Sequence, residues 1–228
     1  MTIRGVLFDF AGTLFSAEPD AGGLAGITDA QGRPLAPDDF GELVRRITSP
    51  ITSFATFDGE FAHAWEHRDL DPELHRVAFV EAIRQAGVAV PEQAARLYAQ
   101  MIDTAGWTPY PDAEDALRSL GERGIPVAVI SNIGFDIRPA FTASGLDQHV
   151  KEYVLSFEHG VVKPDRRIFQ LALDAIGVPA ADAVMIGDSE EADGGSLALG
   201  MRFGLVPPAR PADRPTALLD ALTANGLH

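Results

Sequence analysis

The stretch IRGVLFDFAGTL, residues 3–14, decides the fold that we expect for this chain. Its first six residues form a short apolar run that is typical of a buried strand and too short for a stable helix. The run ends at Asp9, and a Gly-rich, Pro-containing stretch without periodicity follows from Gly12 to Pro37. We therefore expect a strand that presents an aspartate at its carboxyl end, followed by a loop or hairpin that leaves the core.

Beyond Trp107 the chain alternates between predicted helices and strands. The apolar runs typical of buried strands are 125–130, 153–156, 183–186 and 201–206, and the expected helices are 113–123, 135–144, 165–176, 192–199 and 215–224. Strands that alternate with helices predict a parallel sheet built from right-handed βαβ units. The expected fold class is therefore α/β, with a Rossmann-like doubly wound parallel sheet.

A block of predicted helices separates the first strand from the others. Residues 72–86 are predicted to be helical because Asp71 can cap the helix, Pro72 suits its first position and Gly87 stops it. Its expected apolar face is Leu74, Val77, Ala78, Val80 and Ile83. A second helix is expected over 91–104, with the apolar face Ala94, Leu97, Tyr98 and Met101. We expect a catalytic core of residues 1–16 and 107–228 and an inserted helical cap of residues 17–106.

Four polar segments follow the predicted strands, where doubly wound sheets bind their ligands. Asp9 follows the first strand, Ser131-Asn132 the second and Gly187-Asp188 the fourth, while Lys163 precedes a helix near the third. Hard carboxylate oxygens suit Mg²⁺, and a hydroxyl and an ammonium suit phosphoryl oxygens. The chain has only two lysines, so the position of Lys163 is informative.

In order, spacing and context, these four segments resemble the motifs of the haloacid dehalogenase superfamily, of the kind with a helical C1-type cap between motifs one and two. The resemblance covers the whole chain. It implies a Mg²⁺-dependent hydrolase, a phosphatase of a small phosphorylated metabolite that works through an aspartyl-phosphate at Asp9. Asp9 would be the nucleophile because a carboxylate forms a mixed anhydride with phosphate that water then hydrolyses. Lys163 would be the second catalytic residue and would screen Asp9 from the incoming phosphate.

The resemblance also implies the remaining roles. The metal ligands would be Asp9, Asp188 and the main-chain carbonyl of Ala11. Three interpretations of Asp193 stay open. It could be a further acidic metal ligand, a residue that orients water or Lys163, or an ordinary acidic residue that the helix dipole favours at a helix start. The residues expected to bind substrate in the core are Gly12, Thr13, Ser131 and Asn132. Glu190 and Glu191 are expected to be solvated charges.

Position 11 departs from the family pattern. Members that hydrolyse phosphate esters have a second Asp there, which protonates the leaving group and activates water, whereas this chain has Ala11. General acid–base catalysis contributes about 10²–10⁴ in rate, or about 3–5 kcal/mol of barrier. Phosphonoacetaldehyde hydrolases also carry Ala there but use a cap lysine, and residues 17–106 contain no lysine.

Two alternatives stay open. Haloacid dehalogenases have an aromatic residue at position 11 and need no metal, but they lack the Gly-Asp pair that this chain keeps as Gly187-Asp188. The other alternative is a phosphate-binding protein with low or no turnover.

The missing acid could be tolerated in three ways. The substrate could have a good leaving group, it could donate its own proton, or the cap could lend a side chain. The candidates in the cap are Glu18, Asp20, His63 and His67, and Arg68 could clamp an anionic substrate group. The alternative interpretation is that all five are solvated residues of the cap with no role in the reaction.

The composition fits a folded and acidic chain. Its 33 acidic residues against 18 Lys and Arg give a formal net charge of −15, which repels nucleic-acid phosphates and anionic lipid. The chain has no Cys, which excludes disulfides and thiol nucleophiles. Because there is no basic leader and no apolar run of about 18 residues, we expect a soluble cytoplasmic enzyme, monomeric or homodimeric, without nucleic-acid or membrane partners.

Overall fold

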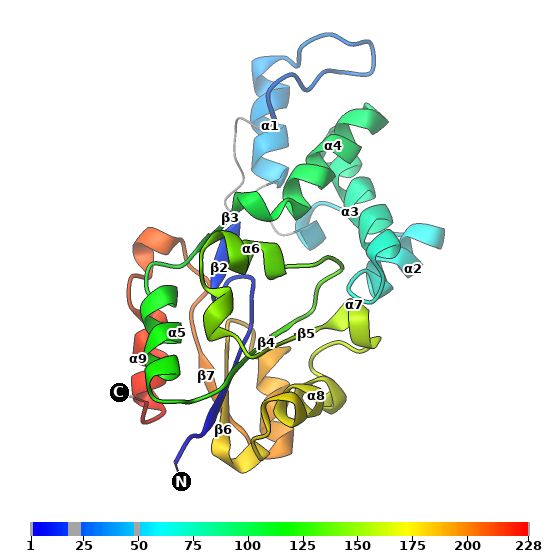
Figure 1. Ribbon diagram of the computed structural model, residues 1–228. Coiled ribbons are helices and arrows are strands. Elements are labelled where there is room, and N and C mark those ends of the chain that lie inside the picture. The colour runs from blue at the N-terminus through cyan, green and yellow to red at the C-terminus, as the bar shows by residue number, and fades with distance from the viewer. Residues whose placement is uncertain (1, 18–23, 48–50, 228) are drawn as a thin grey trace.

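A five-stranded parallel sheet forms the centre of the molecule (Figure 1). The computed structural model describes residues 2–17, 24–47 and 51–227. In the order β5-β4-β1-β6-β7 the strands are Glu152–Leu155, Val127–Ser131, Gly5–Phe8, Ala183–Gly187 and Arg202–Leu205. The predicted doubly wound α/β fold is confirmed, and the first strand of the sequence lies in the middle of the sheet.

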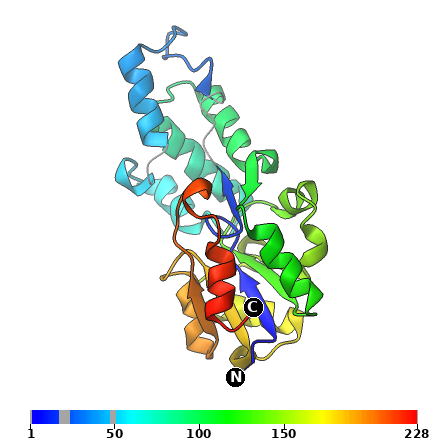
Figure 2. The ribbon, with the colours of Figure 1, turned by 90° about the vertical axis from the view of Figure 1, so that its left-hand side faces the viewer.

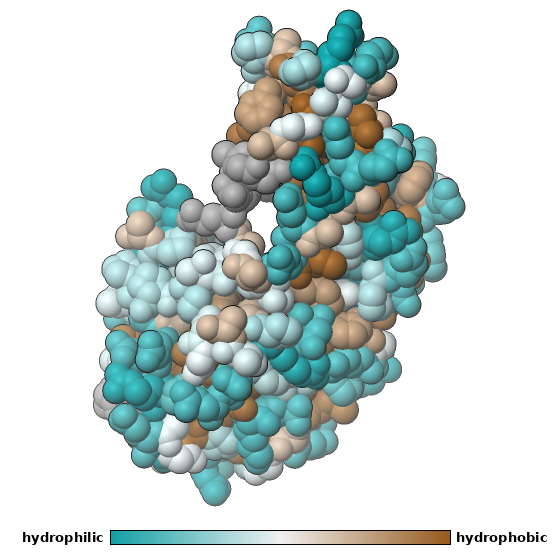
Figure 3. Space-filling model, turned by 45° about the horizontal axis from the view of Figure 1, so that its top comes forward, coloured by the Kyte–Doolittle hydropathy of each residue, from teal (hydrophilic) through white to brown (hydrophobic). Residues whose placement is uncertain are grey.

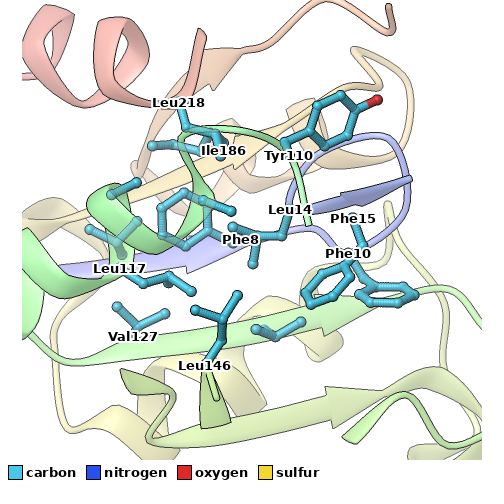
Figure 4. Close-up of a cluster of buried hydrophobic side chains, with 14 of the residues drawn as sticks. Phe8, Phe10, Leu14, Phe15, Tyr110, Leu117, Val127, Leu146, Ile186 and Leu218 are labelled. Carbon is cyan, nitrogen blue, oxygen red and sulfur yellow. The ribbon is translucent and has the colours of Figure 1, made fainter. Parts of the chain in front are cut away.

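Helices cover both faces of this sheet. One face carries α5 (Ala113–Glu122), α6 (Arg138–Ala143) and α9 (Ala217–Ala224), and the other carries α8 (Arg166–Ile176) and the 3₁₀ segment η6 (Asp193–Leu199). Phe8 packs into the first layer, next to Leu117, Val127 and Leu218 (Figure 4). Leu7 packs into the second. Because both faces are buried, the strands are continuously apolar rather than alternating.

A short antiparallel ribbon connects the sheet to the helical insertion. Its strands are β2 (Phe15–Ala17) and β3 (Trp107–Pro109), and Ala17 lies opposite Trp107. The sequence indicated only a loop or hairpin at the first of these positions. The predicted boundaries between core and cap fall in this ribbon, and the division into two domains stays a prediction.

The insertion forms a lobe of helices (Figures 2 and 3). This lobe has an apolar centre of its own. Its helices are α1 (Pro37–Ile47), α2 (Gly59–His67), α3 (Pro72–Ala86) and α4 (Pro91–Ile102), with short 3₁₀ turns at Ile51–Ser53 and Thr104–Gly106. Leu43 of α1, Ala86 of α3 and Leu97 of α4 meet in its centre. The lobe therefore has a core distinct from the two that flank the sheet.

The buried face of α3 shares only Ala78 with the face that the sequence predicted. The residues buried there are His75, Ala78, Ala82 and Ala86, whereas Leu74, Val77, Val80 and Ile83 are only half-buried. His75 is buried because its Nδ1 lies 2.9 Å from the Tyr98 hydroxyl of α4 and its ring stacks on Phe79. On α4 the expected Ala94, Leu97 and Tyr98 are buried.

Other boundaries differ by a few residues. Helix α6 begins at Arg138 instead of Phe135, and the segment expected as a helix over 192–199 is the 3₁₀ turn η6. A one-turn helix, α7 (Ser156–His159), directly follows β5, and further 3₁₀ turns are Asp147–His149, Ala180–Asp182 and Pro211–Asp213. Within the described ranges, none of the helices combines the length and the hydrophobicity that a membrane crossing requires.

The environment of His75 predicts a pH-dependent stability. Burial, and secondly the charge of Arg68, lower the pKa of His75 to about 4. The unfolded chain takes up this proton near pH 6.5, so the contribution of neutral His75 is lost as the pH falls from about 6.5 towards about 4. Between about pH 7.5 and about pH 5.5 the free energy of unfolding should fall by about 1 kcal/mol more in the wild type than in His75→Asn. Urea unfolding at both pH values measures this, and equal losses in the two proteins would contradict it.

Candidate active site

The register of the central strands brings the predicted site residues to one edge of the sheet. Phe8 of β1 lies opposite Val129 of β4 and Ile186 of β6. The Asp9 N–H donates to the Ile186 carbonyl at 3.0 Å, so the ladder extends to Asp9. Ser131 ends β4 and Asp188 follows β6, so both lie at the same carboxyl edge as Asp9.

A buried ammonium lies between two carboxylates at this edge. The Lys163 Nζ is 2.7 Å from Asp9 Oδ1 and 2.6 Å from Asp193 Oδ1, and it also donates to the Ile130 carbonyl at 3.2 Å. The exposed fractions of the three charged side chains are 3% for Lys163, 8% for Asp9 and 1% for Asp193. Charges with so little solvent are stable only when they are paired and hydrogen-bonded, as these are.

The backbone of Lys163 is held by Asn132. The Lys163 N–H donates to Asn132 Oδ1 at 2.7 Å, and Asn132 Nδ2 donates to the Lys163 carbonyl at 2.9 Å. The amide of Asn132 therefore aligns the segment that carries the ammonium. The predicted contact of Asn132 with a phosphoryl group would compete with these two bonds, and it stays a prediction.

Asp193 lies at the start of η6 with its side chain turned into the site. Its second oxygen accepts a hydrogen bond from the Ser189 N–H at 3.0 Å. A Cβ atom on Gly187 would overlap that same oxygen, so glycine is the residue that admits the carboxylate there. Of the interpretations left open, this geometry favours the one in which Asp193 orients Lys163.

A cluster of three carboxylates could bind a metal ion. Asp9, Asp188 and Asp193 each offer an oxygen within 4.8 Å of the others. Gly12 makes room for Asp188, because a side chain there would be opposed both by the φ of +78° and by overlap of its Cβ with Asp188 Oδ2. Three hard oxygen donors around one point are a donor set that Mg²⁺ accepts. The residues present therefore fit the ion that the sequence predicts.

The electrostatics of the cluster show an excess of negative charge. The pKa of Asp9 is raised to about 6, mainly by burial and also by Asp193 and Asp188, although Lys163 opposes the rise. Burial and Asp193 likewise raise the pKa of Asp188. Burial would lower the pKa of Lys163, but Asp9 and Asp193 outweigh it and the net shift is upward. One ammonium thus faces three carboxyl groups, and a bound cation would offset the difference.

Arg214 holds the loop that follows Asp9, and no signal in the sequence pointed to it. It is 2% exposed, and it donates to the carbonyls of Gly12 at 2.6 Å and of Thr13. Its guanidinium also lies 3.4 Å from the centre of the Tyr110 ring. Through Arg214, the C-terminal segment therefore fixes two carbonyl groups of the loop 10–14.

The other core candidates differ in exposure. Ser131 is buried, Thr13 is fully buried with its carbonyl bound to Arg214, and Ala11 is exposed. Glu190 and Glu191 are exposed, as expected. The roles of Ser131, Gly12 and Thr13 in substrate binding, and of the Ala11 carbonyl as a ligand, stay predictions.

The candidates in the insertion contact one another. The rings of His63 and His67 lie 4.4 Å apart on α2, and His63 is exposed. The Arg68 guanidinium stacks on Trp65 at 4.1 Å and lies 3.6 Å from the Asp69 carboxylate. The Arg68 guanidinium is thus already in contact with two side chains of its own segment. Glu18 and Asp20 lie outside the described residues.

Comparisons with known proteins identify a sequence family and similar folds. The sequence model of a hydrolase family, the haloacid dehalogenase-like hydrolases, matches residues 3–199. A phosphoserine phosphatase of Thermus thermophilus is 37% identical over 117 residues, which are 50% of this chain and 47% of that protein. The chain spans about half the length of the first relatives that it matches. A plasmid phosphoglycolate phosphatase of Cupriavidus necator is 28% identical over 228 residues, covering 96% of this chain and 90% of that one. The crystal structure of a HAD phosphatase from Thermococcus onnurineus superimposes with a TM-score of 0.62 at 18% identity, covering 99% of both chains.

The clamp formed by Arg214 predicts a large effect on stability. In Arg214→Ala the carbonyls of Gly12 and Thr13 lose a charged donor and Tyr110 loses its stacked guanidinium, so the free energy of unfolding should fall by about 2–4 kcal/mol. Arg210→Ala is the matched control, since Arg210 is 79% exposed and pairs with Asp213 at the surface. It should change stability by less than about 0.5 kcal/mol. Denaturant titration compares the two, and similar small losses would refute the role of Arg214.

Proposed function

The chain belongs to the haloacid dehalogenase-like hydrolase family, and from this premise we propose that it is a Mg²⁺-dependent phosphohydrolase of a small phosphorylated metabolite. The observation that carries the proposal is the buried contact of Lys163 with Asp9 and Asp193, next to a third carboxylate at Asp188. A cluster with these charges suits a dianionic phosphoryl group bound together with a cation.

Asp9 acts as the nucleophile in this proposal. One of its carboxylate oxygens forms a bond to phosphorus while the bond from phosphorus to the leaving oxygen breaks, giving an aspartyl-phosphate. Water then attacks the phosphorus, which releases inorganic phosphate and restores Asp9. Lys163 holds Asp9 in place and offsets the negative charge that the two reactants share. Ser131, at the end of β4, hydrogen-bonds a phosphoryl oxygen.

The carboxylates of Asp9 and Asp188, with the main-chain carbonyl of Ala11, would hold Mg²⁺, while Asp193 orients Lys163. When bound, the ion supplies positive charge that stabilises the phosphoryl oxygens as charge develops on them. Arg214 keeps the loop 10–14 in the shape that this ligand set requires.

Two further considerations support a phosphate ester as the substrate. The relatives named above include a phosphoserine phosphatase and a phosphoglycolate phosphatase, and both of these names specify a small organic phosphate. The helical insertion, proposed as a cap over residues 17–106, would exclude bulk water and select the leaving group.

Ala11 favours a second candidate function, a phosphate-binding protein with low turnover. Without a carboxyl at position 11, the nucleophile and the charge pair are present but the usual proton donor is missing. A dehalogenase is less favoured, because Asp188 lies close enough to Asp9 to share a cation with it.

A substrate panel distinguishes these functions. We expect the wild type to release phosphate from aryl, acyl or alkyl phosphates, to lose at least about 90% of this activity in EDTA and to regain it with Mg²⁺. Asp9→Asn should lower kcat by at least about 10³-fold because it removes the nucleophile. Phosphate binding without any phosphorylated Asp9 in mass spectrometry would instead indicate the binding protein. Halide release from 2-haloacids in EDTA would indicate a dehalogenase.

A further inference from the structure

The turn between α2 and α3 contacts the core beside the site (Figure 1). The Ser156 hydroxyl, at the start of α7, accepts a hydrogen bond from the Ile133 N–H at 2.9 Å. The same hydroxyl faces two carbonyls to which it can donate, that of Ile133 at 3.1 Å and that of Asp69. Ile133 lies two residues after Ser131, so one buried hydroxyl links Asp69 of the insertion to the loop that follows Ser131.

A second contact fixes the same turn. A Cβ atom on Gly134 would lie 2.5 Å from the His75 Cβ and 2.8 Å from the Arg68 carbonyl, so the two backbones touch at this glycine. His75 is in turn held by Tyr98. The turn that carries Asp69 is therefore held by two contacts with the core, one at Ser156 and one at Gly134. Its backbone is positioned on the core and not only within the insertion.

The side chain of Asp69 is a carboxyl group with little solvent. It is 20% exposed, and the Arg68 guanidinium lies 3.6 Å away. Burial raises the pKa of Asp69, and the charges of Arg68 and of Lys163 both oppose the rise. Lys163, which is buried in the site, is one of the charges that act on this carboxyl, and the contact with Ser156 holds the Asp69 backbone beside the loop that follows Ser131.

We propose that Asp69 is the proton donor and acceptor for which position 11 supplies no carboxyl. This inference rests on the phosphohydrolase function proposed above. As the bond from phosphorus to the leaving oxygen breaks, the Asp69 carboxyl gives its proton to that oxygen, and the leaving group departs as an alcohol. The Asp69 carboxylate then takes a proton from the water that attacks the aspartyl-phosphate. Asp9, Asp69 and the proton count are thereby restored, and the products are alcohol and phosphate.

His63 and His67, the other candidates for this role that the structure describes, fit it less well. His63 is exposed, and the ring of His67 contacts it on α2. Asp69, by contrast, is anchored to the core through its own carbonyl, which a change of its side chain leaves in place. The substitution Asp69→Asn keeps the shape of the side chain and removes its ability to transfer a proton, together with its charge beside Arg68.

The leaving group provides the test. A series of phosphate esters runs from p-nitrophenyl phosphate, whose leaving group needs no proton, to β-glycerol phosphate, whose alkoxide does. In Asp69→Asn, kcat should fall by about 10²-fold or more for the alkyl ester and by less than about threefold for the p-nitrophenyl ester. Glu66→Gln, which changes an exposed carboxylate on α2, is the matched control and should leave both rates unchanged. A variant that is only partly folded lowers all rates equally, so the ratio between substrates is independent of folding.

A second variant tests for rescue. In Ala11→Asp/Asp69→Asn the carboxyl at position 11 should make kcat for the alkyl ester at least about tenfold higher than in Asp69→Asn. An equal loss on all esters in Asp69→Asn, or no rescue in the double variant, would overturn the role of Asp69 while leaving the phosphohydrolase in place. A wild type that releases phosphate neither from this series nor from acyl phosphates would overturn both proposals.

Discussion

The Lys163 ammonium lies between Asp9 and Asp193 with almost no contact with solvent, and the geometry of the site depends on this charge. Without it, two carboxylates would be buried side by side and uncompensated, which costs several kcal/mol in folded proteins. The arrangement also couples distant parts of the chain, because Asn132 holds the backbone of Lys163 and Asp193 begins η6. The fold thus concentrates three carboxyl groups around one ammonium, and Lys163 neutralises their negative charge only in part.

Local patterns in the sequence were sufficient to predict most helices and strands, but not which face of each helix is buried. Helix α3 has the predicted bounds, and Asp71 accepts hydrogen bonds from the N–H groups of Glu73 and Leu74, as a capping residue should. Its buried face could not be predicted, because a hydropathy pattern treats His75 as polar. Only its contact with Tyr98, on another helix, makes burial of that imidazole favourable. The ribbon of β2 and β3 was missed because each strand has three residues and no alternation.

The same distinction applies to the site. The convergence of Asp9, Ser131, Lys163 and Asp188 could be predicted because each lies next to a recognisable strand or helix, and parallel strands bring their carboxyl ends together. Arg214 bonds a residue 202 positions away, and Ser156 meets Asp69 across 87 positions. No spacing rule connects such residues, since the contacts arise only when the C-terminal segment and the helical insertion pack against the sheet.

The ribbon of β2 and β3 has a consequence for how such molecules diversify. Ala17 and Trp107 lie opposite each other, so the chain leaves and re-enters the sheet domain at nearly the same point. Any folded segment whose two ends are about 5 Å apart could be spliced in there without disturbing the strands beneath. The helical lobe, with its own apolar centre, therefore occupies a position where an inserted segment can vary in length and sequence while the sheet stays the same.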